Sequence, residues 1–188
     1  MVVDQWIDLK CHPSGRPEAV RAIEVLVRRP AGAELQISYR LHGDVSRIRV
    51  PLRGVPCFAT GLWRHTCFEA FIATAGRAAY HEFNFAPSGD WAVYVFRSYR
   101  DGAPLADEMA RPCIAVCSTG SLLELDAVIR LDGLSAVHSG ASLRIGLSAV
   151  IETGDGLSYW ALRHPADKPD FHHADGFALE IEAPSPGR

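Results

Sequence analysis

Two glutamates, Glu69 and Glu82, lie in neighbouring apolar segments that are separated by the turn-like residues 74–77. If residues 74–77 form a tight hairpin turn, the alternation of side chains predicts that Glu69 stands directly opposite Glu82, with Asn84 on the same face. Like charges directly opposite each other destabilise a sheet. The pattern therefore predicts a cation between the two carboxylates, a shared proton or a bound ligand.

Three chemical interpretations of this face stay open. A polar platform of Glu69, Glu82 and Asn84 can bind the hydroxyl groups of a ligand. The two carboxyl groups can instead act as an acid and a base, as in glycosidases. The third interpretation is a solvated face of glutamates and arginines that has no function. Arg97 and Arg100 are the candidate cations, but they point to opposite faces of the next predicted strand, and its register is not fixed by the sequence.

An indole ring next to these carboxylates adds a second kind of chemistry. Trp63 precedes the segment that carries Glu69, in a loop or at the start of a strand. The flat apolar face of tryptophan suits the C–H face of a pyranose ring, while carboxyl and amide groups suit its hydroxyl groups. Trp91 and Trp160 lie in strand-like segments, where packing in the core is the usual role of tryptophan. Trp63 is therefore the best candidate for stacking on a ligand.

A histidine-rich segment, residues 163–175, contains three of the eight histidines and three aspartates. One interpretation is a transition-metal site, with the candidate ligands His164, Asp170, His172 and His173. Their spacing matches no strong metal motif. The favoured interpretation is a rigid loop whose polar side chains hydrogen-bond the backbone and which can form one rim of a pocket.

The elements that must position these residues are predicted to be strands. Every second residue is apolar in residues 35–41, and this alternation recurs along the chain. Residues 17–29 have an early proline that suits a helix, but their alternating β-branched residues favour a strand. Strands are predicted over residues 17–29, 35–41, 67–73, 80–85, 91–99, 113–117, 122–130, 142–152, 157–163 and 177–182. About ten short strands with turns between them indicate an all-β antiparallel sandwich or barrel.

Composition bounds the classes of protein that the chain can be. The 188 residues are 48% apolar and 22% charged, with a formal net charge of -3. These values exclude a disordered, collagen-like or coiled-coil chain. Without a basic excess, nucleic acid is not an expected partner, and no apolar run is long enough to span a membrane. A single domain over residues 1–183 is predicted, followed by a flexible tail over residues 184–188.

The number of cysteines indicates the cellular compartment in which the protein works. Their number is five, and an odd number in a chain of this length is not typical of a disulfide framework. Cys113 and Cys117 fall on one face of a predicted strand, and we expect them to be small buried thiols. With no secretory signal in the sequence, these observations favour a cytoplasmic location.

Two runs of residues carry a family resemblance. Residues 62–71 have the pattern Leu-Trp-x-x-Thr-Cys-Phe-Glu-x-Phe, and residues 80–91 have the pattern Tyr-x-Glu-Phe-Asn-Phe-x-Pro-x-Gly-x-Trp. Tyr-Trp-Ala-Leu-x-His-Pro, beginning at residue 159, and Lys-Pro-Asp-Phe-His, beginning at residue 168, complete the pattern. With these motifs the chain resembles bacterial DOMON-like proteins and, more loosely, the related family 9 carbohydrate-binding modules.

The resemblance implies a β-sandwich with a ligand pocket on or beside one sheet, and non-catalytic binding of a sugar or polyol. In the sugar-binding relatives, two tryptophans enclose a terminal sugar and nearby polar side chains bind its hydroxyl groups. Trp63 and Glu69 match the first tryptophan and its acidic partner. Arg97 or Arg100 matches the arginine, and Trp160 is a candidate for the second wall. The expected partner is a small sugar-like molecule, and no cofactor is expected.

Three alternatives of other classes stay open. One is a purely structural or protein-binding role, which an exposed apolar patch in place of a pocket would favour. Other DOMON relatives bind haem through methionine and histidine, and here Met109 could pair with His65, His81 or His164, although no spacing singles one out. An enzyme could use the Glu69/Glu82 pair or the loop from His164 to His173. No nucleophile elbow, phosphate loop or strong metal motif supports an enzyme.

Overall fold

The computed structural model describes residues 5–15, 18–30, 33–51, 54–134, 136–165 and 167–184. The predicted flexible tail, from residue 185 onward, lies outside the described residues, and so does the proline at position 17. Within the described residues there are twelve strands. They are β1 (Ile7–Cys11), β2 (Val20–Arg28), β3 (Glu34–Gly43), β4 (Cys67–Thr74), β5 (Tyr80–Phe85), β6 (Trp91–Ser98), β7 (Asp101–Pro104), β8 (Cys113–Ser118), β9 (Leu122–Arg130), β10 (Leu143–Thr153), β11 (Gly156–Ala161) and β12 (Leu179–Ile181).

Helical elements are short. One α-helix, α1 (Ala136–Gly140), precedes β10 in the described chain. Four 3-10 helices are η1 (Val45–Arg47), η2 (Leu62–Arg64), η3 (Glu108–Ala110) and η4 (Ala174–Gly176). The strand expected over residues 17–29 is confirmed as β2. Two strands, β1 and β7, were not expected from the sequence.

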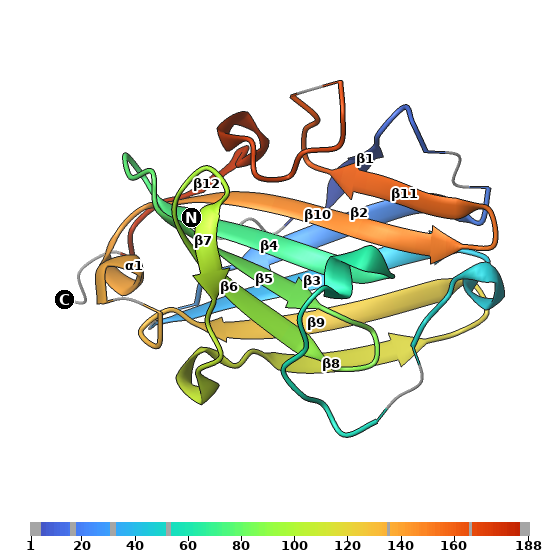
Figure 1. Cartoon of the computed structure of the whole chain (residues 1–188), viewed down its shortest axis with the longest axis horizontal. Helices are drawn as coiled ribbons and strands as arrows, with labels where there is room; N and C mark the ends of the chain where they lie inside the picture. Colours follow the sequence, from blue (N-terminus) through green and yellow to red (C-terminus); the bar gives the residue numbers. More distant parts are fainter. Residues whose placement is uncertain are drawn as a thin grey trace.

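The strands form two antiparallel layers (Figure 1). We call β7-β6-β5-β4-β10-β11 the site sheet and β1-β2-β3-β9-β8 the back sheet; β12 pairs with β10. Strand β1 joins the two layers, because it pairs with β2 on one side and with β11 on the other. The predicted antiparallel β-sandwich is confirmed.

Side chains that alternate along the strands fill the space between the layers. Tyr39 of the back sheet packs on Phe68 of the site sheet, with 5.0 Å between ring centroids. The Tyr39 hydroxyl donates a hydrogen bond of 2.7 Å to the Glu69 carbonyl oxygen, which ties the layers together. Since Phe68 faces this core, its neighbour Glu69 has its side chain on the outer face of the site sheet.

The register of the β4–β5 hairpin differs from the prediction. Glu69 stands opposite Asn84, and Glu82 stands opposite Phe71. The expected direct Glu69–Glu82 pairing is wrong, because the connection between the strands spans residues 75–79 rather than a tight turn. Tyr80 instead pairs with Ala73 and stacks on Phe96, with 4.7 Å between centroids. A shift of two residues keeps every side chain on its predicted face, so both glutamates still share the outer face.

The thiols of β8 also differ from expectation. Cys113 and Cys117 are exposed, so the prediction that they are buried is wrong. Strand β8 lies at the end of the back sheet, and these residues occupy its outer face. One face of an antiparallel sheet can be exposed to water, so the small thiols on that face of β8 are not buried.

Candidate functional site

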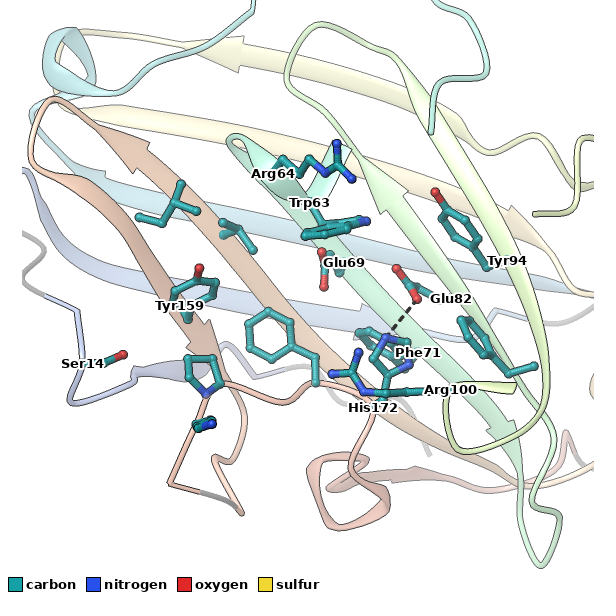
Figure 2. Close-up of a pocket in the computed structure, with 16 residues that line it drawn as sticks. Ser14, Trp63, Arg64, Glu69, Phe71, Glu82, Tyr94, Arg100, Tyr159 and His172 are labelled. Atoms are coloured by element: carbon teal, nitrogen blue, oxygen red, sulfur yellow. Dashed lines mark ion pairs between the residues drawn. The ribbon is translucent and has the colours of Figure 1, made fainter. Parts of the chain in front are cut away.

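A cavity of about 680 Å³ lies on the outer face of the site sheet. Its floor comes from β4, β5, β6, β10 and β11, and it is bounded by η2 and by the segment 168–172. Figure 2 shows Trp63, Glu69, Glu82 and Tyr159 around this space. The lining residues are Ser14, Trp63, Arg64, Glu69, Phe71, Glu82, Tyr94, Phe96, Arg100, Val150, Leu157, Tyr159, Lys168, Pro169, Phe171 and His172.

The two predicted carboxyl groups form part of the floor. Glu69 is 2% exposed and Glu82 is 5% exposed. Ser148 donates a hydrogen bond of 3.2 Å to Glu69 Oε2, and Asn84 Nδ2 donates one of 2.6 Å to Glu82 Oε1. Asn84 is fully buried and does not line the cavity, so it holds Glu82 in position from behind.

Burial changes the protonation of this pair. Burial, followed by the negative charge of Glu82, raises the pKa of Glu69 well above its ordinary range, against the hydrogen bond from Ser148. Burial also raises the pKa of Glu82 to about 7, although Asn84 and Arg100 oppose the change. Near neutral pH the floor therefore holds protons, so it can donate as well as accept hydrogen bonds.

His172 lies beside the carboxyl pair and is neutral. Its Nε2 is 3.6 Å from Glu82 Oε2 (Figure 2). Its Nδ1 is 2.9 Å from the Tyr80 hydroxyl oxygen. Burial, and then the charge of Arg100, lowers the pKa of His172 to about 4. Because the Arg100 N–H donates to the Tyr80 oxygen, we assign the Tyr80 proton to the His172 Nδ1 bond. His172 Nε2–H is then directed at Glu82.

An ion pair attaches the histidine-rich loop to the site sheet. Asp170 accepts hydrogen bonds from the Arg100 guanidinium at 2.9 Å, from the Tyr99 hydroxyl at 2.6 Å and from the His172 amide at 3.1 Å. These bonds lower the pKa of Asp170 although partial burial alone would raise it. The same contacts place His172 and Phe171 over the sheet, as expected for a loop that forms one rim.

Trp63 lies at the mouth of the cavity and is 47% exposed. It belongs to η2, which begins after Gly61 in the left-handed conformation with φ 77°. The Gly61 amide donates to the Tyr94 hydroxyl at 3.3 Å, and His65 Nδ1 is 2.8 Å from Glu152 Oε2. Both ends of this short helix are therefore attached to the site sheet. The indole is held over the cavity without being buried in the core.

Besides Asn84, the structure places two more predicted binding residues outside the cavity lining. Trp160 is 5% exposed and belongs to the core between the sheets, so it does not form a second wall. Its neighbour Tyr159 lines the cavity instead, because adjacent strand residues face opposite ways. Arg97 is exposed and pairs with Asp101 at 3.0 Å, outside the cavity. Of the two candidate arginines, Arg100 is the one that lines it.

Several lining aromatics were missed by the sequence analysis. Phe71 and Tyr94 share the face of Glu82, and both are its partners across the sheet. Phe71 comes two residues after Glu69 on the same strand, so alternation was a usable signal for Phe71, whereas the register that places Tyr94 was not fixed by the sequence. Tyr159 and Phe171, with ring centroids 6.3 Å apart, complete the aromatic surroundings. Nothing in the sequence showed that residue 171 would lie over the sheet.

The candidate metal ligands have other partners. His164 Nε2 is 2.7 Å from the Lys10 carbonyl oxygen, and His173 Nδ1 accepts from the Asp175 amide. Asp170 is occupied by Arg100, and His172 by Tyr80. Among the described residues, no group of three or more histidine, cysteine, aspartate or glutamate side chains is arranged to hold a metal ion.

The proposed haem ligands do not meet at the cavity. Met109 is 64% exposed in η3 and is not a lining residue. His81 is buried and bonded to His138, with 3.0 Å between ring nitrogens. His65 is bonded to Glu152. The histidines and Met109 thus occupy separate places in the fold.

Comparison with known proteins places the fold. No protein-family model matches the chain, and no curated protein matches its sequence. A solved structure of a candidate carbohydrate-binding protein from Bacteroides uniformis is similar, with a TM-score of 0.64 and 14% identity, over 89% of this chain and 81% of that chain. A family 9 carbohydrate-binding module from Caldicellulosiruptor kristjanssonii in complex with glucose has a TM-score of 0.58 and 9% identity, over 97% of this chain and 85% of that chain.

A third similar structure is a family 9 module from the same organism in complex with cellotriose. Its TM-score is 0.52 at 9% identity, over 92% of this chain and 76% of that chain. At these identities the likeness shows a shared β-sandwich fold. In the part of the chain that the structure describes, no helix has the length and apolar character needed to cross a membrane.

Proposed function

We propose that the protein binds a sugar or similar polyol in the cavity on the site sheet, without catalysis. The observation that carries this proposal is an indole face held open at the cavity mouth above a floor of hydrogen-bonding carboxyl groups. An aromatic face packs on the C–H face of a sugar ring, and carboxyl groups bind its hydroxyls. Trp63 supplies the ring, and Glu69 and Glu82 supply the polar contacts.

The shape of the cavity supports a small ligand. A volume of about 680 Å³ lies within the range of small-molecule sites, which is roughly 300–1,000 Å³. Aromatic residues Phe71, Tyr94 and Tyr159 surround the polar floor. The similar structures that contain glucose and cellotriose share this fold, and they make these two sugars the first ligands to test.

We also propose a family and a cellular location for the protein. The DOMON-like pattern of residues 62–71 and 80–91 supports placing the chain beside bacterial DOMON-like proteins. The five cysteines all lie in described segments and are free thiols, which supports a reducing compartment such as the cytoplasm. A soluble sugar, rather than a polysaccharide outside the cell, would then be the ligand.

Titration calorimetry with glucose, cellobiose and cellotriose tests the proposal. Trp63→Ala removes the stacking face, and we expect it to weaken binding about tenfold or more, equivalent to about 1.4 kcal/mol. The matched control is Trp6→Ala. The Arg40 guanidinium carbon lies over the Trp6 ring, 4.1 Å from the ring centroid. Trp6 does not line the cavity.

Two outcomes would contradict the proposal. If none of the sugars binds the folded wild-type protein, carbohydrate is not the ligand. If a sugar binds equally well to Trp63→Ala and to Trp6→Ala, binding occurs away from the cavity mouth. Circular dichroism of both variants shows whether each retains the β fold.

A further inference from the structure

One oxygen of each carboxyl group at the cavity floor accepts no hydrogen bond from the described protein. Among described residues, Ser148 alone donates to the Glu69 carboxyl group, through Oε2, and Asn84 alone donates to that of Glu82, through Oε1. Glu69 Oε1 accepts no hydrogen bond from the described residues, and the nearest donor to Glu82 Oε2 is His172 Nε2 at 3.6 Å, beyond hydrogen-bond distance. Both oxygens face the cavity rather than the packed interior, so a hydrogen-bond donor of the ligand can reach them.

No charged side chain of the described protein forms an ion pair with these carboxyl groups, and the more distant Arg100 lowers the pKa of Glu82 without offsetting its burial. No described arginine, lysine or histidine lies within the 4.0 Å ion-pair distance of Glu69. Glu82 has His172 alone at 3.6 Å, and His172 is neutral because its pKa is lowered to about 4. Two largely buried acidic groups thus share the floor without a charged ion-pair partner, an arrangement that costs free energy whenever both are ionised.

The cations of the lining lie at the rim, in water. Arg64, from η2, lies over the Trp63 ring, 5.1 Å from its centroid. Arg100, from the β6–β7 turn, is bound to Asp170, and Lys168 is exposed. Water screens these exposed charges far more than it screens the buried carboxyl groups. The electrostatic preference at the floor is therefore set by Glu69 and Glu82.

We infer that the cavity prefers an amino sugar, a sugar that carries an ammonium group, over the neutral sugar of the same shape. This inference rests on the proposed function. An ammonium group supplies three N–H donors and the missing positive charge to Glu69 Oε1 and Glu82 Oε2. The aromatic rings of Phe71 and Tyr94, which line the same floor, add cation–π attraction.

Release of a proton on binding is a second measurable consequence of an ammonium group in the cavity. The carboxyl pair holds protons near neutral pH, because burial raises both pKa values. When an ammonium group takes the place between the carboxyls, the pair ionises and releases a proton to the buffer. A neutral sugar needs no such change. Only the amino sugar should therefore show a binding enthalpy that depends on the ionisation enthalpy of the buffer.

Calorimetry at pH 7 compares glucose, glucosamine and N-acetylglucosamine, which has no positive charge. We expect glucosamine to bind about tenfold or more tightly than the other two, and we expect proton release for glucosamine alone. Glu69→Gln and Glu82→Gln keep the shape of the floor and remove one acid each. Each should reduce the ratio of glucosamine affinity to glucose affinity.

The control variant is Glu124→Gln, at a glutamate of the back sheet that pairs with Arg40 at 2.8 Å. It should leave the affinity ratio unchanged. If glucose binds as tightly as glucosamine, or more tightly, the inference is overturned while the proposed function stands. If glucosamine is preferred but both cavity variants keep the full ratio, the ammonium group binds elsewhere and the inference also fails. If no sugar binds, the proposed function itself fails.

Discussion

At the scale of the residue, Glu82 is the clearest case of a side chain with altered chemistry. Burial raises its pKa in the folded state to about 7, above the ordinary value of 4.5. Between these two pH values the folded state binds more protons than the unfolded state. The resulting stabilisation is complete below about pH 4.5 and is lost as the pH rises to about 7.

Glu82→Gln removes this titration. Relative to wild type, the variant should become more stable as the pH rises from 5 to 8, by about 3 kcal/mol, because a pKa difference of one unit corresponds to about 1.4 kcal/mol. Urea unfolding at several pH values measures the difference. A stability difference that does not change with pH would show that burial leaves the titration of Glu82 unaltered.

His172 has the opposite sign, which is why the difference between variants is more informative than the wild-type curve. Its pKa is lowered from 6.5 to about 4, so its contribution is present above pH 6.5 and is lost as the pH falls through about 4. The stability of the wild-type protein combines both trends. Subtracting the wild-type curve from that of Glu82→Gln removes the trends that the two proteins share and leaves those that depend on Glu82.

Residue types predicted part of this site. Alternation placed Glu69 and Glu82 on one face, and this conclusion survived an error of two residues in register because side chains repeat every two residues. Alternation could not tell which face of β11 meets the core. The family resemblance made Trp160 a candidate for the second wall, but Trp160 lies in the core and Tyr159 is the residue of that pair that lines the cavity.

At the scale of the element, the β6–β7 hairpin determines where Arg100 lies. Arg100 adopts a left-handed conformation with φ 55°, in a two-residue turn between Ser98 and Asp101. For an L-residue other than glycine this conformation costs roughly 1–2 kcal/mol. The ion pair with Asp170 and the bond from its amide to Tyr80 accompany this strained turn.

Two substitutions separate the backbone from the side chain. Arg100→Gly and Arg100→Ala both lose the Asp170 ion pair, but only glycine adopts a positive φ without strain. We expect the glycine variant to be more stable than the alanine variant by about 1 kcal/mol. Thermal unfolding of the pair checks this, and equal stability would mean that the turn relaxes when the guanidinium is removed.

Element prediction succeeded where alternation was long and failed where strands were short. The alternation of residues 35–41 correctly indicated β3, but β7 has four residues, all exposed, and so it has no apolar face to recognise. Strand β1 has one fully buried residue, Leu9, and is held by pairing with strands from both sheets. Such tertiary pairing leaves little trace in the local sequence.

At the scale of the whole molecule, the sandwich is predicted to unfold as one unit. The main core cluster takes residues from both sheets, and β1 pairs with both. For a chain of this length, cooperative unfolding predicts a heat-capacity change of about 2.5 kcal/mol/K. Differential scanning calorimetry should show one transition with equal calorimetric and van't Hoff enthalpies. Two separable transitions would contradict the prediction of a single domain over residues 1–183.

The shared strand also orders events during synthesis. Cys11 of β1 can pair with Trp160 of β11 only after the ribosome has added roughly 150 more residues. At about 5–20 residues per second, the nascent chain waits roughly 8 to 30 s with this edge unpaired. The lining spans Ser14 to His172, so the cavity is assembled among the last features of the nascent protein. A chain released early would present its strands to other chains and would have no complete cavity.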